Sequence, residues 1–388
     1  MTITSTTTDR VPMSATQILE NVRALAAEAA ALSDEVNVLG HLTPDLAQKI
    51  RTSGALRMAW PAAWGGPGMT FRQVAEIGEI LAHADASVAW NTMILGATTG
   101  IWAGTWDEAT ARAIYPSMDM GTSGGFFPPQ RADAVPGGWL VNGRWSFASG
   151  IHSADRYFVG IHLHRDGKPQ FDQTGAPVLR VAMVPPETVT ILDTWQVMGL
   201  QGTGSTDYLV KDAFVADAHL LDFFGDHGPS AAPLSRYPAL IGLIKIGMPI
   251  GIAQRILDEA ISALQARGGA DRHARITLAD AAAQVEAARA YARIALDRVD
   301  GMLFNGEELD RPGWATASMA SVQTAAQCRA AVEMLADLVG TRSIYIRNGL
   351  ERRRRDLSVA SAHVSFQRRS LEAAGAALLG EDFNGQQI

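Results

Sequence analysis

The sequence predicts an α+β protein, mainly α, in which a helical region comes first, an antiparallel sheet follows and a helical bundle ends the chain. Three observations predict this order. Helix-cap signals dominate to about residue 118, short aromatic and β-branched runs between glycines continue to about residue 228, and alanine-rich stretches of helical period follow. With 388 residues, 47% of them hydrophobic, the chain can bury a continuous core in two or three layers.

The first helical region is predicted to span residues 14–118. Ser14 and Thr70 each precede a glutamine by three residues, which is the spacing of a capping box at a helix N-terminus. Residues 1–13 are rich in Ser and Thr and lack the basic and apolar parts of a signal peptide. We therefore expect them to form a disordered lead-in.

The middle region, residues 119–228, is predicted to be a β-domain. Its strand candidates are the runs 139–141, 157–159 and 179–184. Aromatic and β-branched residues favour strands, and the pair Asn142-Gly143 favours a turn between them.

The last region, residues 229–388, is predicted to form four antiparallel helices. Their 3.6-residue periods cover residues 245–267, 275–303, 315–340 and 356–379. The expected domain order is thus helical, β, helical.

Charge and composition exclude several classes of function. The net charge of −7 argues against a nucleic-acid partner, and the basic run 352–355 is expected to make ion pairs at a helix end. The apolar stretch Leu240–Ala253 contains Lys245 and Pro249 and is too short to cross a bilayer, so no membrane insertion is expected.

Cysteine and histidine usage points away from disulfides and metals. The single Cys328 excludes an internal disulfide and a thiolate cluster, which fits a reducing cytoplasm. His162 and His164 alternate along a strand without a third ligand nearby. No metal site is expected.

Four strings fall in the order seen in one known fold. They are Pro61–Gly68, Leu140–Gly143 followed by Trp145–Gly150, Gly199–Asp207, and Arg355-Asp356 before the last helix. Together with the helical, β, helical order, they resemble the acyl-CoA dehydrogenase fold over almost the whole chain from about residue 15.

Within that superfamily, the strings 145–150 and 202–205 look more like those of the two-component flavin-dependent monooxygenases, which include aromatic and steroid-phenol hydroxylases and dibenzothiophene monooxygenase. This resemblance implies reduced FMN or FAD from a partner reductase and a C4a-hydroperoxyflavin that hydroxylates a small aromatic or amine-bearing substrate. It also implies a homotetramer with flavin sites at subunit contacts.

Two further observations from the residues agree with this. The dehydrogenases need a carboxylate as base, but the two positions where the family carries it fall near Ile241 and Val364, which cannot accept a proton. Gly202-Thr203-Gly204 lacks the third glycine and the βαβ context of a dinucleotide fingerprint, so reducing equivalents must come from a separate reductase or from the substrate.

Catalytic and flavin-ring residues follow from the resemblance. His363 is predicted to contact substrate or peroxide, since an imidazole titrates near neutral pH. Ser149 matches the hydroxyl residue near flavin N5, Phe147 would stack on the ring, and Ser123 would meet its pyrimidine edge. Without the resemblance, Ser149 reads equally well as a strand-end serine satisfied by its own backbone.

Pocket and phosphate residues are assigned in the same way. Trp90, Asn91 and His83 lie in a segment that resembles the cleft-lining helix of the hydroxylases, although core packing is the plainer explanation for a tryptophan. The flavin phosphates would meet the four residues Arg267, Gly340, Arg342 and Ser343, by resemblance to the dehydrogenases' inter-subunit contacts. Surface caps at helix ends would use the same residue types.

Two alternatives stay open at this point. One is an acyl-CoA dehydrogenase or oxidase whose catalytic base has moved elsewhere, which would bind FAD tightly and be reduced by an acyl-CoA. The other is a binding module that kept the fold without enzymatic activity, which would hold no flavin.

Overall fold

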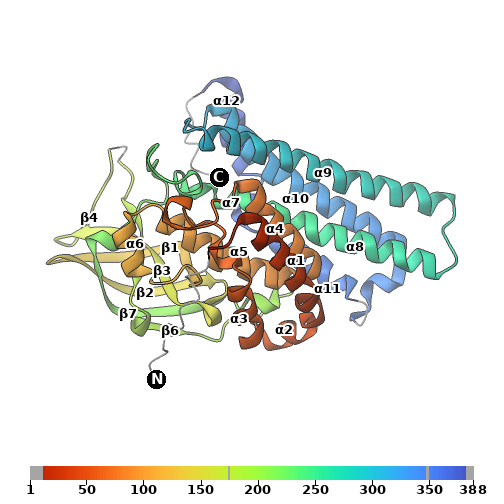
Figure 1. Cartoon of the computed structure of the whole chain (residues 1–388), viewed down its shortest axis with the longest axis horizontal. Helices are drawn as coiled ribbons and strands as arrows, with labels where there is room; N and C mark the ends of the chain where they lie inside the picture. Colours follow the sequence, from red (N-terminus) through yellow and green to blue (C-terminus); the bar gives the residue numbers. More distant parts are fainter. Residues whose placement is uncertain (1–11, 174, 347–348, 382–388) are drawn as a thin grey trace.

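The N-terminal helices lie between a sheet and the long C-terminal helices (Figure 1) in the computed structural model, which describes residues 12–173, 175–346 and 349–381. Most of the expected lead-in, residues 1–13, lies outside the described residues. The N-terminal helices are α1 (Ala15–Ala31), α2 (Ser33–Leu39), α3 (Pro44–Thr52), α4 (Phe71–Ala84), α5 (Ala86–Ala103) and α6 (Glu108–Ile114).

The two cap signals have different outcomes. Thr70 and Gln73 form a complete capping box, in which the Gln73 N–H donates to Thr70 Oγ1 and the Thr70 N–H donates to Gln73 Oε1. Ser14 also caps its helix, because its hydroxyl accepts from the Gln17 N–H at 3.1 Å. The Gln17 side chain, however, donates to Asn21 in place of the cap, so this box is only half formed.

The described residues form one eight-stranded sheet whose strand order is β6-β7-β2-β1-β3-β5-β8, with β4 paired to β3. The strands are β1 (Thr122–Val135), β2 (Gly138–Ala148), β3 (Arg156–Arg165), β4 (Lys168–Pro169), β5 (Leu179–Val184), β6 (Val189–Ile191), β7 (Thr206–Ala216) and β8 (Leu220–Leu221). All pairings are antiparallel except that of β1 with β3. The prediction of a purely antiparallel sheet was wrong for that pair, because the chain crosses from β2 to the other edge of β1 before β3 begins.

The predicted turn at Asn142-Gly143 was also wrong. Both residues lie inside β2, at a shift of register with β7, and Asn142 Oδ1 accepts from the Asp212 N–H at 2.7 Å. The hairpin turn between β1 and β2 contains Gly137 instead, whose φ of +80° favours glycine.

The C-terminal helices are α7 (Ile241–Ile244), α8 (Gly247–Ala266), α9 (Arg272–Phe304), α10 (Arg311–Val339), α11 (Leu350–Ser361) and α12 (Ser370–Leu379). Three of the four predicted helices match α8, α9 and α10. The fourth, 356–379, is broken into α11 and α12, with the short 3-10 helix η12 (Val364–Phe366) between them. Arg355-Asp356 therefore lies within α11 and does not open a helix.

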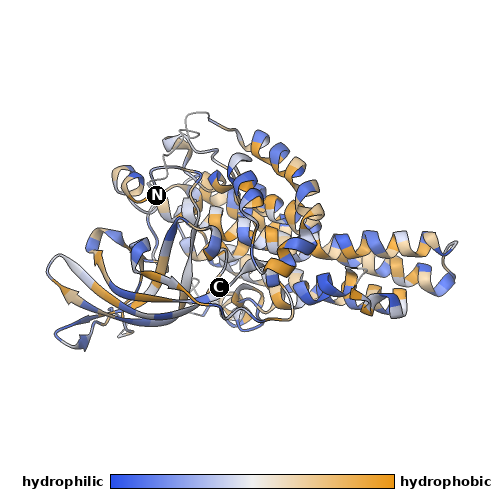
Figure 2. Cartoon of the chain, turned by 90° about the horizontal axis from the view of Figure 1, so that it is seen from below, coloured by the Kyte–Doolittle hydropathy of each residue, from blue (hydrophilic) through white to orange (hydrophobic). Residues whose placement is uncertain are grey.

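Helix α8 packs closely on α4 through two glycines. A Cβ at Gly247 would lie 2.1 Å from the Ala75 carbonyl oxygen, and one at Gly251 would lie 2.2 Å from that of Glu79. The stretch Pro238–Ala266 is long and apolar enough to cross a membrane, contrary to the estimate from sequence, but 89% of its apolar window is buried inside the protein. This stretch is therefore part of the protein core. Figure 2 shows that the long C-terminal helices carry both apolar and polar residues along their length.

Buried and partly buried arginines join the helices to the sheet and to one another. Arg57 makes a two-pronged ion pair with Asp119, and Arg51 binds Asp155 at 2.7 Å. The arginines of the run 352–355 pair with Asp34, Glu259, Glu333 and Glu351 respectively, as expected for ion pairs along a helix.

Candidate active site

Four side chains from distant parts of the sequence meet between α5, the end of β2, the end of α7 and the segment before η12. The Trp90 indole N–H donates to Ser149 Oγ at 3.0 Å, and its ring lies edge-on to His363 with centroids 5.3 Å apart. Lys245 Nζ lies 3.2 Å from His363 Nε2 and 5.6 Å from the centre of the Trp90 ring. We call Trp90, Ser149, Lys245 and His363 the indole cluster.

A chain of hydroxyls leads away from Ser149, and its direction is set at the far end. Thr203 Oγ1 donates to the Leu200 carbonyl at 2.8 Å, so it can only accept from Ser205, 2.7 Å away. Ser205 has then used its proton and must accept from Ser149 at 2.6 Å. Since Ser149 also accepts from Trp90, its oxygen keeps room to accept one more hydrogen bond and has no proton left to donate.

Phe147 presents an aromatic face beside this hydroxyl. Its side chain is 69% exposed, lies edge-on to Trp195 with centroids 6.2 Å apart, and sits at a φ of +64°, a conformation that is unfavourable for a bulky residue. A strained and exposed aromatic ring is a signal of function more than of packing.

Ser123 and Asn91 support the backbone around Ser149. Ser123 Oγ donates to the Ser149 carbonyl at 2.7 Å, and Asn91 Nδ2 donates to the Gly202 carbonyl at 3.0 Å. Asn91 Oδ1 is buried and has no hydrogen-bond partner among the described residues. The structure thus brings both residues to the surroundings of Ser149, where they hold the backbone.

The tautomer of His363 follows from its contacts. The Ser365 N–H donates to Nδ1 at 3.2 Å, so the neutral ring carries its proton on Nε2, facing Lys245. Burial first, and the Lys245 charge second, hold the pKa of His363 well below its usual range. Both ring nitrogens are therefore engaged within the protein.

Lys245 is itself buried, with 5% of its surface exposed. Burial lowers the pKa of its amine to about 8. Among the described residues, no carboxylate makes a hydrogen bond or ion pair with any member of the indole cluster, so the base of a dehydrogenase is absent from it.

Asp356 has a different place from the one expected. It is buried in α11, and its Oδ1 accepts from the Leu200 N–H at 2.6 Å, while the Arg355 guanidinium donates to the Met198 carbonyl. Burial raises the pKa of Asp356 to about 7. The pair therefore fixes the segment that carries the Leu200 carbonyl, on which the hydroxyl chain ends.

The family of the chain follows from its similarity to known proteins. The N-terminal domain model of the acyl-CoA dehydrogenases matches residues 13–113, and a C-terminal domain model matches residues 244–368. The indole-3-acetate monooxygenase of Pseudomonas putida is 30% identical over 357 residues, which are 88% of each chain. The chain belongs to the flavin-dependent monooxygenases of the acyl-CoA dehydrogenase superfamily.

Two further similarities agree with that membership. The oxygenase component of an FADH2-dependent resorcinol hydroxylase from Rhizobium sp. is 28% identical over 372 residues, 87% of this chain and 88% of that protein. The crystal structure of the HsaA monooxygenase from M. tuberculosis superposes with a TM-score of 0.89, covering 97% of this chain and 100% of that one at 23% identity, and shows the shared fold.

The site fits the ring of a reduced flavin. A flat aromatic cofactor needs an exposed apolar face, which Phe147 and Trp195 offer, and the N5–H of a reduced flavin needs an acceptor. Ser149 is such an acceptor, because the hydroxyl chain has consumed its proton.

The predicted phosphate residues gather at another place. Arg267 donates to the Val339 carbonyl at 3.0 Å, which puts it beside η10 (Gly340–Ile344), where Gly340, Arg342 and Ser343 lie. Figure 1 shows this end of α8 and α10 pointing away from the sheet. Within one chain these residues do not meet Ser149 and Phe147.

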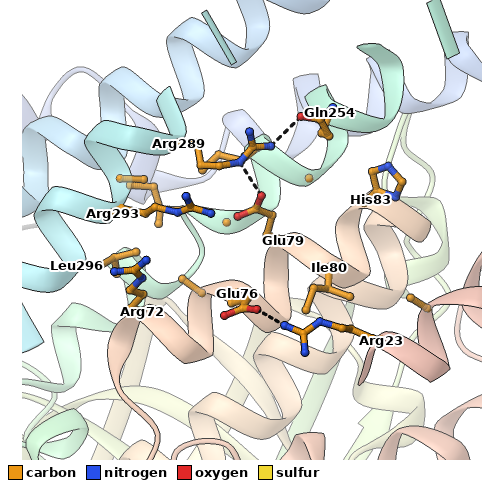
Figure 3. Close-up of a pocket in the computed structure, with 17 residues that line it drawn as sticks. Arg23, Arg72, Glu76, Glu79, Ile80, His83, Gln254, Arg289, Arg293 and Leu296 are labelled. Carbon is orange, nitrogen blue, oxygen red and sulfur yellow. Dashed lines mark hydrogen bonds and ion pairs between the residues drawn. The ribbon is translucent and has the colours of Figure 1, made fainter. Parts of the chain in front are cut away.

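His83 does not join the indole cluster either. Its Nε2 contacts Asp258 on α8 at 2.8 Å, and it lines a pocket of about 440 Å³ between α1, α4, α8 and α9. Figure 3 shows this pocket crossed by ion pairs, with Arg289 between Glu79 and Gln254 and Arg23 against Glu76. The prediction that groups His83 with Trp90 and Asn91 was wrong, because successive turns of α4 and α5 face different neighbours.

A second pocket, of about 1010 Å³, opens beside the hydroxyl chain. It is lined by Trp195, Gly204, Thr206 and the stacked rings of His41 and His152, whose centroids are 4.5 Å apart. Burial first, and the neighbouring His41 second, lower the pKa of His152. Trp195 connects this pocket to Phe147.

Four residues of the site were not predicted from the sequence: Lys245, Trp195, Ser205 and Thr203. Lys245 carried a signal, because it is the one charged residue in Leu240–Ala253. A lysine in an apolar segment is rarely buried without a purpose. Ser205 and Thr203 lay in a string that was noted for its resemblance, but their role depends on contacts with Ser149 that no local pattern contains.

Proposed function

We propose that this chain is the oxygenase component of a two-component system, which takes reduced flavin from a separate reductase and uses O2 to hydroxylate a small aromatic substrate. The observation that carries the proposal is the direction of the hydroxyl chain, which leaves Ser149 as an acceptor beside the exposed Phe147. Bound reduced flavin would supply the oxygen chemistry, since it reacts with O2 and passes one oxygen atom to the substrate.

The residues of the chain have distinct parts in this proposal. Phe147 and Trp195 would hold the flavin ring, and Ser149 would accept a hydrogen bond from its N–H. Trp90 orients Ser149 and separates it from Lys245, which would manage a proton on the substrate side, and from His363, which contacts Lys245 through Nε2. The buried surroundings of the cluster exclude water, which would divert the reaction to hydrogen peroxide.

FAD is the first flavin to test, because the resorcinol hydroxylase is described as FADH2-dependent. We further propose that the protein is a cytoplasmic homotetramer in which Arg267, Gly340, Arg342 and Ser343 of one subunit contact the flavin phosphates of another. These residues lie at the C-terminal ends of α8 and α10, which point away from the sheet, and this position supports a contribution from a second subunit.

The test is turnover with a flavin reductase, NADH, FAD and O2, using resorcinol and indole-3-acetate as first substrates. Product and hydrogen peroxide are both measured, so that their ratio reports how well reduced flavin is used. We expect Ser149→Ala to lower the product share at least about tenfold, as for loss of one hydrogen bond to a charged or strongly polarised group.

Ser321→Ala is the matched control, because Ser321 is also fully buried and donates to the Ala317 carbonyl within α10. It is expected to leave the ratio unchanged. Anaerobic reduction of bound FAD by an acyl-CoA would favour the dehydrogenase alternative instead. A protein that binds neither oxidised nor reduced flavin would favour the non-enzymatic alternative.

A further inference from the structure

Lys245 is a buried amine without a negative partner. Only 5% of its surface is exposed, and among the described residues its polar contact is with His363 and with no carboxylate. Burying an ammonium without a counter-charge is costly, so natural proteins retain such a residue where a ligand or substrate supplies the missing charge.

The contacts of His363 favour the uncharged amine while the site is empty of substrate. The Ser365 N–H holds Nδ1, so the ring presents its Nε2 proton to Lys245 Nζ. If Nζ were an ammonium, its hydrogens would face the Nε2 hydrogen of His363, and no hydrogen bond could form. The free amine, in contrast, can accept this bond, which agrees with the direction in which burial moves its pKa.

Lys245 also lies within a small molecule's reach of the proposed flavin face. Its Nζ is over the ring of Trp90, and the indole N–H of the same residue donates to Ser149. One indole thus separates the amine from the hydroxyl that would contact flavin. A substrate whose acidic group met Lys245 would have its ring directed toward Ser149.

We propose that Lys245 binds the acidic oxygen of the substrate, a phenol or a carboxylate on a small aromatic ring. The claim that this acid is a substrate rests on the proposed function. When the oxygen arrives as a phenol, its O–H bond breaks, the electron pair stays on oxygen, and the Nζ lone pair forms the new N–H bond. When it arrives as a carboxylate, the amine takes its proton from solvent, and in both cases an ammonium faces an oxyanion.

The first experiment compares acids with analogues in which the acidic O–H is replaced, on the full chain loaded with reduced FAD under argon so that no turnover occurs. The pairs are resorcinol with 1,3-dimethoxybenzene and indole-3-acetate with indole-3-acetamide. We expect each acid to bind at least about tenfold more tightly than its analogue, as for a charge-assisted hydrogen bond.

In Lys245→Met, the dissociation constants of at least one acid and its analogue should differ by no more than about threefold. Lys211→Met, which changes an exposed lysine on β7, should keep the preference for the acids. Equal binding of acids and analogues by the unaltered protein would overturn the inference. So would an acid preference that survives in Lys245→Met.

A second measurement needs no variant and separates the two kinds of acid. Calorimetry at pH 9 in two buffers of different ionisation enthalpy counts the protons taken up on binding. Binding of indole-3-acetate should take up about one proton from the buffer, because Lys245 must be protonated from solvent. Binding of resorcinol should take up about none, because its own phenol proton moves to Lys245. No uptake with either acid would contradict the inference. An acid-selective protein that hydroxylates neither acid would refute the proposed function and leave Lys245 as the acid-binding residue.

Discussion

The hydroxyl of Ser149 donates to Ser205 across 2.6 Å, and this direction is fixed by a carbonyl two residues further along the chain of contacts, that of Leu200. A serine near a flavin could in principle donate or accept. Here the hydroxyl proton of Ser149 is used by Ser205, so Ser149 can only accept from a further partner. The structure therefore favours a partner with an N–H at this place. N5 of a flavin carries a hydrogen in the reduced form and none in the oxidised form.

Ser205→Ala tests this directly. Without the Ser205 oxygen, Ser149 regains a proton that it can donate, so the preference for reduced over oxidised FAD should fall by about 1 kcal/mol, or roughly fivefold. Anaerobic titration of both redox forms, followed by tryptophan fluorescence, gives the two dissociation constants. Ser321→Ala should keep the preference of the unaltered protein; an undiminished preference in Ser205→Ala would remove the argument from direction.

Phe147→Gly should separate binding from stability. Glycine accepts the φ of +64° without strain, so the free energy of unfolding should change by less than about 1 kcal/mol, while flavin affinity should fall at least about tenfold with the loss of the exposed ring. Asp212→Gly is the matched control, because Asp212 is exposed and has a φ of +51°. Flavin affinity that is equal in both variants would show that Phe147 does not hold the cofactor.

Asp356→Asn should change how stability depends on pH. Because burial raises the pKa of Asp356 from 3.8 to about 7, the carboxyl favours the folded state at low pH, and this contribution is lost as the pH rises through about 7. An amide can still accept from the Leu200 N–H but never ionises. We expect the variant to lose less stability than the unaltered protein between pH 5 and pH 8, by about 2–4 kcal/mol.

Denaturant unfolding at several pH values measures this difference. Asp337→Asn, at an exposed position on α10, serves as the comparison. Parallel curves for the Asp356→Asn variant and the unaltered protein would mean that Asp356 is already ionised in the fold at pH 5.

Lys245→Met should stabilise the fold at the expense of the proposed activity. Burial lowers the pKa of Lys245 to about 8, so below pH 8 the folded state either buries an ammonium or gives up a proton that the unfolded chain keeps. Both destabilise the fold, and this cost fades as the pH rises toward 10. Methionine has a similar length and no charge. We expect a gain of about 1–3 kcal/mol at pH 7 that shrinks by pH 9.5, with Lys211→Met neutral at both. A loss of stability at pH 7 would show that the amine contributes more through its contacts than its burial costs.

The sequence predicted the order of the elements because that order depends on local patterns. Cap signals, the 3.6-residue period of α8 to α10 and the β-branched runs of β2, β3 and β5 are each contained within a few neighbouring residues. The break between α11 and α12 was missed, because the alanine-rich composition continues through it. The Ser365 N–H bond to the His363 side chain that shapes it is local, but a histidine is not one of the usual N-cap residues.

The candidate site divides in the same way. The residue types at Ser149, Phe147, Trp90 and His363, and the absence of a carboxylate at Ile241 and Val364, could be read from the sequence and directed attention to flavin chemistry other than dehydrogenation. Only the tertiary structure decided that Lys245 faces His363, that His83 faces away, and that Ser149 accepts and does not donate. The reason is physical: a residue's chemistry is carried by its own atoms, whereas its protonation, direction of hydrogen bonding and partners depend on groups that become adjacent only after folding. In these three examples the partner is 56, 118 and 175 residues away in the chain.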